Sequence, residues 1–457
     1  MRTAIVLFNR DLRTHDNPAL AAAASAGALL PLFVLDPALL RGFGCPNRLR
    51  FMLESLADLD RSLRAAGSAL VVREGDPVAE TIRVAAGCGA GEVHVGADWS
   101  RYARGREGGL AAACERSRLA FHRHPGVTVV PPGEVLPARG GGDDRGRAPH
   151  FRVFTPYFRA WRESPWRCAA PRPRRLPPLP EVGSAALPDP LRLAPGASPG
   201  LAAGGESEGR RRLAAFLRSI GDYGESRDDL AADATSNLSA HLRFGCLSPL
   251  EVARRSLRRE GGEAFARQLC WRDFHHQVLA AFPDYPRRDY RPRGDRWSRS
   301  VRALQAWKEG RTGYPIVDAG MRQLALEGRM HNRARMIVAS FLCKDLYIDW
   351  RRGAEHFWGL LADGEIANNA GNWQWVAGTG NDTRPNRVLS PLRQAHRFDP
   401  RGDYVRRYVE ELSSIDGPAV HEPWRLGPLQ RGALGYPEPI VDHAEAVAAF
   451  RAARGSA

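Results

Sequence analysis

The 457-residue chain is predicted to fold into an α/β amino-terminal domain, with a Rossmann-like parallel sheet of five strands, followed by an all-α domain. Three observations predict this. Short apolar runs alternate with helical patterns over residues 1–130, proline, glycine and arginine dominate residues 131–209, and helical patterns without strands fill residues 210–457. Because strand–helix alternation favours a parallel sheet covered on both faces, we expect two domains joined by a long connector.

Five apolar runs are the expected strands, at residues 3–8, 28–36, 68–76, 91–98 and 127–131. After the first run, Asn17 and Pro18 offer a cap and a first-turn proline for a helix. Residues 48–66 place leucines at helical spacing, and another helix is expected from Pro77. No G-x-G-x-x-G motif follows the first strand, so the sequence gives no support for an ordinary dinucleotide site there.

In the connector, only residues 149–161 have the pattern of a structured segment. Beyond residue 210, Ser248 and Glu251 form a capping box around Pro249 at the first helical position, and helical patterns recur to the end. The expected domains are therefore residues 1–130, the connector 131–209, and the helical residues 210–457.

The chain is strongly basic, with 66 basic and 51 acidic residues and a formal charge of +15. Arginine supplies nearly all of the positive charge, since Lys308 and Lys344 are the only lysines. The preference for arginine over lysine is explained by the base composition of a GC-rich genome as well as by a functional need for arginine. Base composition does not explain the net excess of positive charge, which favours a polyanionic partner such as nucleic acid.

Seven scattered cysteines without a C-x-x-C pair indicate buried free thiols and argue against disulfides or a metal site. The amino-terminal run is too short for a signal peptide, and no segment has the length of a membrane span. We therefore expect a soluble cytoplasmic protein that binds no metal.

Residues 330–375 are rich in tryptophan and asparagine but hold no phosphate-binding loop, metal cluster or nucleophile motif. Such a composition suggests that the protein moves electrons rather than protons. On a helix opening at Asn332, residues 332, 335, 336 and 339 share one face. Arg335 on that face needs a partner, and Asp363 is the candidate; an ordinary salt bridge between helices would explain the pair equally well.

Asn369 and Trp373 are four residues apart and share a face of the next helix. A buried amide left without a hydrogen bond costs ~1–3 kcal/mol, so either backbone or a ligand must satisfy Asn369. Residues 235–239 gather hydroxyl and amide groups before a helix, which suits a phosphate or a simple helix cap. Trp271 beside Arg272 could stack a base and hold a phosphate, or Trp271 could belong to the core.

Several motifs together resemble the photolyase/cryptochrome flavoproteins in order and spacing. They are Tyr223, TSNLS at 235–239, CWRDF at 270–274, MHNRARM at 330–336 and DGEIANNAGNWQW at 363–375. FNRDLRTHDNPAL at 8–20 and FVLDP at 33–37 resemble the amino-terminal domain of that family. The resemblance covers nearly the whole chain except the connector, and is closest to the bacterial class I photolyases of cyclobutane pyrimidine dimers.

The resemblance implies non-covalent FAD in the helical domain. The residues that match its contacts are Tyr223, Thr235, Ser236, Asn237, Leu238, Ser239, Arg272, Asn332, Arg335, Asp363, Gly364, Glu365 and Asn369. Among them, Asn369 matches the residue that faces flavin N5. Trp297, Trp350 and Trp373 match a relay that carries electrons from the surface to the flavin.

The resemblance also implies light-dependent repair, in which excited reduced FAD passes an electron to a pyrimidine dimer flipped out of UV-damaged DNA. The matching lesion and DNA contacts are Arg227, Gln268, Trp271, Arg272, His275, Asn332, Arg333, Met336 and Trp375. The alternatives are a blue-light-sensing cryptochrome and a (6–4) photolyase. The protein is expected to be a monomer.

Three positions depart from the usual pattern of the dimer-specific enzymes. Gln268 replaces a glutamate, as it does in the (6–4) enzymes. Those enzymes, however, carry a histidine pair where this chain has His331 and Asn332, which argues against (6–4) repair. Arg329 replaces a tryptophan, and Glu365 replaces an aspartate.

A second, light-harvesting chromophore is expected in the α/β domain. Phe33, Asp36, Arg48 and Asp98 resemble the pocket of relatives that use 8-hydroxy-5-deazaflavin, which we favour over methenyltetrahydrofolate. A purely structural role at a sheet edge and in a helix would explain these four residues nearly as well.

Overall fold

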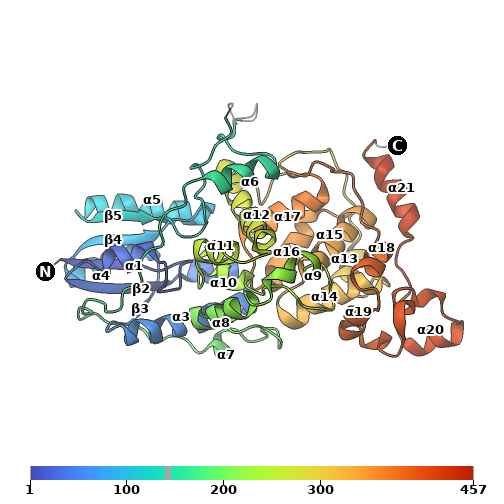
Figure 1. Cartoon of the computed structure of the whole chain (residues 1–457), viewed down its shortest axis with the longest axis horizontal. Helices are drawn as coiled ribbons and strands as arrows, with labels where there is room; N and C mark the ends of the chain where they lie inside the picture. The colour runs from blue at the N-terminus through green and yellow to red at the C-terminus, as the bar shows by residue number, and fades with distance from the viewer. Residues whose placement is uncertain (1, 139–145, 456–457) are drawn as a thin grey trace. The chain divides into compact units, whose positions relative to one another are not determined.

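The computed structural model describes residues 2–138 and 146–455 of the chain (Figure 1). It comprises two compact units, each described here by itself. The first unit contains Met1–Ala197, Ala202–Gly221 and Ser236–Pro283, and the second contains Ser198–Leu201, Asp222–Thr235 and Asp284–Ala457. The domain boundaries expected at residues 130 and 209 stay a prediction.

The first unit contains a five-stranded parallel sheet in the order β3-β2-β1-β4-β5. Its strands are β1 (Thr3–Leu7), β2 (Ala28–Leu35), β3 (Val71–Glu74), β4 (Ala90–Gly96) and β5 (Ala120–His124). The predicted parallel α/β fold is confirmed, and four of the five strands lie within predicted runs, to within one residue at the start of β4.

Helices cover both faces of this sheet (Figure 1). Along β1, Ala4 and Val6 pack with α1 (Pro18–Ala23) and α3 (Pro46–Ala65), whereas the alternate residues Ile5 and Leu7 pack on the other side. That other side is covered by α4 (Pro77–Cys88) and α5 (Arg101–Arg116). Strands buried on both faces explain why their sequences read as continuous apolar runs.

The helix-capping residues predicted from the sequence act as caps. The side chain of Asn17 accepts a hydrogen bond from the backbone N–H of Leu20 at 3.0 Å, with Pro18 opening α1. Ser248 likewise accepts from the backbone N–H of Glu251 at 3.2 Å. These bonds satisfy N–H groups that have no partner within the first turn of a helix.

The fifth strand was predicted in the wrong place. Residues 127–131 form no strand despite their apolar character, and β5 instead is Ala120–His124, which pairs in parallel with β4. The β5 sequence, AFHRH, holds two apolar residues followed by three polar ones and so contains no long apolar run. The apolar run expected for a strand buried on both faces is therefore missing from β5, and the sequence did not predict this strand.

The backbone after β5 is bound by side chains of α12 (Gly262–Ala281) rather than by a strand. Oδ2 of Asp273 accepts the backbone N–H groups of Val129 and Val130 at 2.9 and 3.0 Å, and the indole N–H of Trp161 at 2.9 Å. The guanidinium of Arg272 donates to the carbonyl of Val127. Because these groups are already bonded, they are not available for a sheet ladder.

Of the remaining helices of the first unit, α2 (Pro37–Phe43) lies between β2 and β3 in the chain, and the others follow β5. These others are α6 (Phe154–Glu163), α7 (Pro190–Leu193), α8 (Glu206–Phe216), α10 (Ser239–Arg243) and α11 (Pro249–Leu257). Helix α6 lies at the predicted structured part of the connector. All seven cysteines are free thiols, five of them buried, but Cys168 is exposed, contrary to the expectation of buried thiols.

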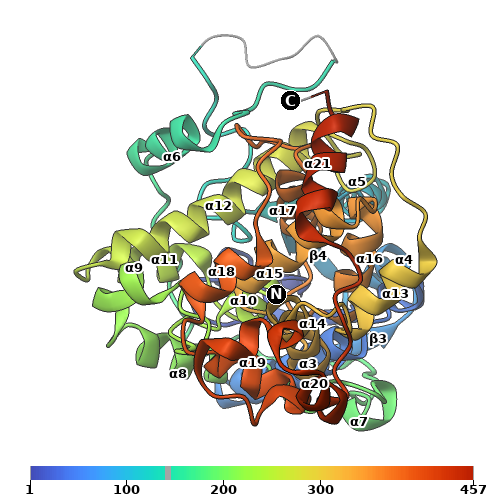
Figure 2. The same cartoon turned by 90° about the vertical axis from the view of Figure 1, so that its right-hand side faces the viewer.

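The second unit is built from helices, and its described residues hold one isolated β-bridge, between Ser298 and Ile348. Its α-helices are α9 (Tyr223–Ser226), α13 (Val301–Glu309), α14 (Pro315–Glu327), α15 (Asn332–Ser340), α16 (Trp350–Leu360), α17 (Ile366–Ala377), α18 (Pro391–Phe398), α19 (Asp403–Tyr408), α20 (Pro428–Leu434) and α21 (His443–Ala453). Helices α15, α16 and α17 lie together near the centre of Figure 2. Among the described residues, no helix is both long and apolar enough to cross a membrane.

Asp273 gives a pH-dependent test of this fold. Burial raises the pKa of Asp273 to about 6, although Arg272 and the three N–H donors act in the opposite direction. A folded-state pKa above the unfolded value means that the proton stabilises the native state below pH 4, and that this stabilisation is lost as the pH rises to 6. We expect the loss to amount to about 3 kcal/mol in the wild type and to be absent in Asp273→Asn, whose amide oxygen still accepts the N–H groups.

Unfolding midpoints measured from pH 4 to 7 check this prediction. The midpoint of the wild type should fall relative to that of Asp273→Asn over this range. Parallel pH profiles for the two proteins would contradict it.

Candidate functional site

Helix α15 begins with a histidine cap. Nδ1 of His331 accepts the backbone N–H of Arg333 at 3.1 Å, so the imidazole carries its proton on Nε2. Burial lowers the pKa of His331 to about 4, which keeps the ring neutral. His331 is thus used to start the helix, and Asn332 next to it is exposed.

The predicted pairing of Arg335 with Asp363 is confirmed. Nη2 of Arg335 lies 2.8 Å from Oδ2 of Asp363, and Nε donates to the carbonyl of Met330 at 2.9 Å. The Asp363 side chain is 6% exposed and that of Arg335 28% exposed. The Nη1 group of Arg335 makes no hydrogen bond within residues 2–138 and 146–455, so it remains available to a ligand.

Asn369 on α17 is satisfied by backbone, one of the two alternatives that the sequence left open. Its Nδ2 donates to the carbonyl of Ala354 on α16 at 3.0 Å, which fixes the orientation of the amide because a carbonyl only accepts. In the described part of the chain, Oδ1 of this half-buried residue makes no hydrogen bond. An acceptor held rigidly in this way suits a protonated ring nitrogen.

Glu365 and Gly364 lie in the turn that precedes α17. Glu365 is buried at the cap position of that helix, and the amide of Asn368 donates to its carboxylate. The backbone N–H of Gly364 donates to the carbonyl of Leu361 at 3.3 Å. The glutamate that replaces the usual aspartate therefore takes part in the structure of the helix start.

Trp373 is buried among other rings of the second unit. Its ring centroid lies 5.0 Å from that of Phe357 and 6.1 Å from that of Trp307, both edge to face. Trp307, which the sequence analysis did not single out, is fully buried and donates its indole N–H to the carbonyl of Val338 at 3.0 Å. A fully buried tryptophan in an amphipathic helix gives no sequence signal that distinguishes it from ordinary core.

The two other predicted relay tryptophans differ in burial. Trp350 is fully buried and donates its indole N–H to Asp289 at 2.8 Å, with the Arg351 guanidinium 4.6 Å from its ring. Trp297 is half-buried and lies 5.0 Å from the ring of Tyr347. The series Trp373, Trp350 and Trp297 thus runs from buried to partly accessible, as a relay to the surface requires; the relay itself stays a prediction.

Gln374, between the two tryptophans of α17, is a residue that the sequence analysis missed. Its buried amide accepts the backbone N–H of Tyr290 at 2.7 Å and donates to the carbonyls of Tyr285 and Arg288 at 2.6 and 3.1 Å. Gln374 therefore binds the segment that precedes α13 to helix α17. The neighbouring Trp375 is half-buried, with the Arg387 guanidinium 5.6 Å from its ring.

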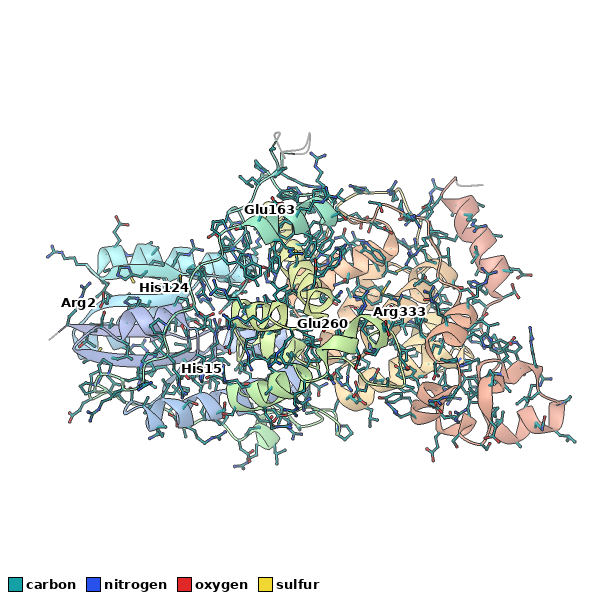
Figure 3. The ribbon with its side chains drawn as sticks, viewed as in Figure 1. Arg2, His15, His124, Glu163, Glu260 and Arg333 are labelled. Carbon is teal, nitrogen blue, oxygen red and sulfur yellow. The ribbon has the colours of Figure 1, made fainter. Side chains whose placement is uncertain are left out.

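Arg333, a predicted lesion contact that is labelled in Figure 3, is paired within the second unit. Its Nη2 lies 2.7 Å from Oδ2 of Asp228, and the guanidinium is 4.2 Å from the ring of Phe398. Nη1 contacts Sδ of Met336 at 3.9 Å. Arg227, beside Asp228 in the chain, is half-buried and forms no ion pair with any described residue.

The predicted polar turn is shared between the units, with Thr235 in the second and Ser236 to Ser239 in the first. Leu238 occupies the cap position of α10 and no side chain caps that helix, so the simple-cap alternative is wrong. Asn237 has a φ of 52°, a left-handed conformation that asparagine tolerates. Tyr223 is buried, and burial raises its pKa to about 12.

Trp271 in the first unit stacks on a partner that the sequence did not reveal. Its ring lies 3.7 Å from that of Phe154 with an interplanar angle of 3°, and Arg267 lies 4.9 Å from the Phe154 ring. Trp271 is only half-buried, so the core-tryptophan alternative does not describe it fully. Phe154 therefore covers one face of the indole.

Near Trp271, Gln268 is half-buried, and its side-chain amide makes no hydrogen bond within the described residues. His275, one turn beyond Trp271, lies 5.9 Å from its ring and is buried. Burial lowers the pKa of His275 to about 4, and its Nδ1 has no partner among the described residues. Burial also lowers the pKa of Arg272 to about 10.

Two of the residues expected to hold an antenna pigment follow strands of the sheet, whereas Phe33 lies within β2 and Arg48 within α3. Asp36 follows β2 and accepts the Tyr102 hydroxyl at 2.5 Å, while Asp98 follows β4 and pairs with Arg10 at 3.1 Å. Burial alone would raise the pKa of Asp98, but Arg10, His276 and the backbone N–H of Trp99 hold it well below its usual range. Phe33 and Arg48 are buried in the same unit. Parallel α/β sheets bind ligands at such carboxyl ends.

Two family models match the chain. One, described as the DNA photolyase domain, matches residues 4–181, and the other, described as the FAD binding domain of DNA photolyase, matches residues 265–455. A deoxyribodipyrimidine photo-lyase of Streptomyces griseus is 53% identical over 461 residues, which cover 100% of both chains.

Solved structures agree in fold. A bacterial class III photolyase from Agrobacterium tumefaciens has a TM-score of 0.90 and 33% identity, covering 100% of this chain and 97% of its own. A cryptochrome from Synechocystis sp. PCC6803 has a TM-score of 0.89 and 29% identity, covering 99% of both chains. The chain belongs to the DNA photolyase family, and it carries that family's FAD-binding domain.

Gly353 on α16 allows the close approach of Trp373. A Cβ at this position would lie 2.2 Å from Cη2 of Trp373 and 2.6 Å from Leu342. We expect Gly353→Ala to displace the indole and lower the free energy of unfolding by about 1–3 kcal/mol.

Gly359 on the same helix is the matched control, because a Cβ there meets nothing within 4 Å. Gly359→Ala should raise the stability by about 0.5–1 kcal/mol. Denaturant unfolding of both variants checks the pair of predictions, and equal effects of the two substitutions would contradict them.

Proposed function

We propose that this protein is a deoxyribodipyrimidine photo-lyase, an enzyme that uses light to split cyclobutane pyrimidine dimers in DNA. The observation that carries the proposal is the 53% identity to a photo-lyase of that name over the full length of both chains. The excess of positive charge agrees with a DNA substrate, because basic side chains neutralise phosphates.

FAD, when bound, supplies the light absorption and the electron that protein side chains lack. The chemistry of the side chains in the second unit fits this cofactor. Arg335 offers the free donor Nη1 on a guanidinium fixed by Asp363, and Asn369 offers the free acceptor Oδ1 on an amide fixed by Ala354. We assign Arg335 and Asp363 to the flavin edge and Asn369 to its N5 position. Tyr223, Thr235 to Ser239, Asn332, Gly364, Glu365 and Arg272 complete the proposed contacts.

In the first unit, we assign the stacking contact of the lesion to Trp271, with Gln268 as a polar contact. In the second unit, Asn332, Arg333 and Trp375 stay predicted lesion contacts. A base stacked on an aromatic side chain gains ~1–3 kcal/mol. The indole of Trp271 is held in place by Phe154, so it need not reorganise to receive a base. Arg227, Arg272, His275 and Met336 are the further proposed contacts of the lesion or the DNA.

His331 is occupied as the cap of α15, and Asn332 follows it, so this position offers no second histidine for (6–4) chemistry. The proposal also includes 8-hydroxy-5-deazaflavin as the antenna, beside Asp36 and Asp98. A monomeric state and a cytoplasmic location stay predictions.

The decisive experiment uses chemically reduced protein, blue light and an oligonucleotide with one thymine dimer. Thymine absorbance should return under light and not in the dark, while an oligonucleotide with a (6–4) product should be unchanged. Bound FAD without any loss of dimers would contradict the proposal and favour a cryptochrome-like sensor. Repair of the (6–4) product would favour a (6–4) photolyase.

The tryptophan relay has its own test. Trp297→Phe should slow light-driven reduction of bound FAD at least about 10-fold, because phenylalanine is far harder to oxidise than tryptophan, but should spare repair by chemically reduced protein. Trp424→Phe is the control, since Trp424 is another half-buried tryptophan of the second unit that is outside the relay. Normal light-driven reduction in Trp297→Phe would exclude Trp297 from the relay.

A further inference from the structure

Four polar side chains gather on one face of the sheet, outside every site described above. Glu92 and His94 lie two residues apart on β4, and His122 and His124 lie two residues apart on β5. His94 pairs with His122 in the strand register, and their rings stack at 4.7 Å. No metal site was expected from the sequence, because the seven cysteines are scattered and no C-x-x-C pair is present.

The distances suit a metal ion of ordinary size. Oε2 of Glu92 lies 3.7 Å from Nε2 of His94 and 3.6 Å from Nε2 of His122. The ligand atoms of these three residues all lie within 4.8 Å of one another. Ligands at 2.0–2.1 Å around tetrahedral Zn²⁺ are about 3.4 Å apart, so a small rotation of the exposed His122 completes the geometry.

The buried member of the cluster presents an unused nitrogen. His94 is 5% exposed, and its Nε2 has no hydrogen-bond partner among the described residues. Its Nδ1 lies 2.9 Å from Nε2 of His124. If Nδ1 donates that bond, the lone pair of His94 Nε2 points to the carboxylate, and His124 acts as the outer partner that orients metal-binding histidines.

We propose that Glu92, His94 and His122 bind one Zn²⁺ ion, with His124 as the orienting partner of His94 and a water molecule as the fourth ligand. The ion would join β5, the last strand of the sheet, to β4. Such a clamp stabilises an edge strand that is otherwise paired on one side only. The site is separate from the proposed repair chemistry and does not depend on it.

Arg2 is the competitor for this site (Figure 3). Its Nη2 lies 2.8 Å from the same Oε2 of Glu92 that faces the two histidines, and its side chain is 60% exposed. A metal ion must displace this guanidinium or use the other carboxylate oxygen. Arg2→Gln should therefore bind Zn²⁺ more tightly than the wild type.

The test uses the full chain with its FAD, without a histidine tag and after removal of metal by a chelator. Zn²⁺ titrated against a chromophoric chelator should show one site per chain, and the ion should raise the thermal midpoint and slow amide exchange in β5. Co²⁺ should give the visible absorption of a four-coordinate nitrogen and oxygen site.

His94→Gln and His122→Gln should abolish the site, and His124→Ala should weaken it by about 10–100-fold. His396→Gln is the matched control, because His396 is as exposed as His122 and lies 3.8 Å from a carboxylate, that of Glu422. Absence of saturable binding would overturn the proposal. So would an affinity that falls equally in His396→Gln and His122→Gln, which would mean adventitious binding only.

Discussion

The ion pair between Arg335 and Asp363 is the constraint on which the candidate flavin site depends. It links α15 to the turn before α17, and the backbone N–H of Ala362 joins the same turn to the end of α14 by donating to the carbonyl of Gly328 at 2.8 Å. Once this turn is fixed, the start of α17 is fixed. The positions of Asn369, Trp373 and Trp375 along that helix follow from its geometry.

Local rules predicted much of the fold and part of the site. Four strands, the caps at Asn17 and Ser248 and the face of α15 follow from patterns within a few residues. The Arg335–Asp363 pair was predicted as well, because a cation on the polar face of α15 needs a counter-charge. For Asn369 the sequence predicted only that the amide must be hydrogen-bonded, and it left open whether backbone or a ligand would be the partner.

What the sequence did not predict depends on contacts between distant segments. The strand expected at residues 127–131 is absent because Asp273, more than 140 positions later, binds its N–H groups. Phe154 supports Trp271 from another helix, and the four residues of the proposed zinc site meet only through strand pairing. Each of these depends on the tertiary fold, which local periodicity does not encode.

The FAD content of Asp363→Asn tests the central claim most directly. This substitution keeps the shape of the side chain but removes the charge that holds Arg335. We predict that bound FAD per chain falls at least about 10-fold while the helical content is retained. Asp403→Asn, which removes an exposed ion pair on α19, should keep its FAD. An Asp363→Asn protein with wild-type FAD content would contradict the account.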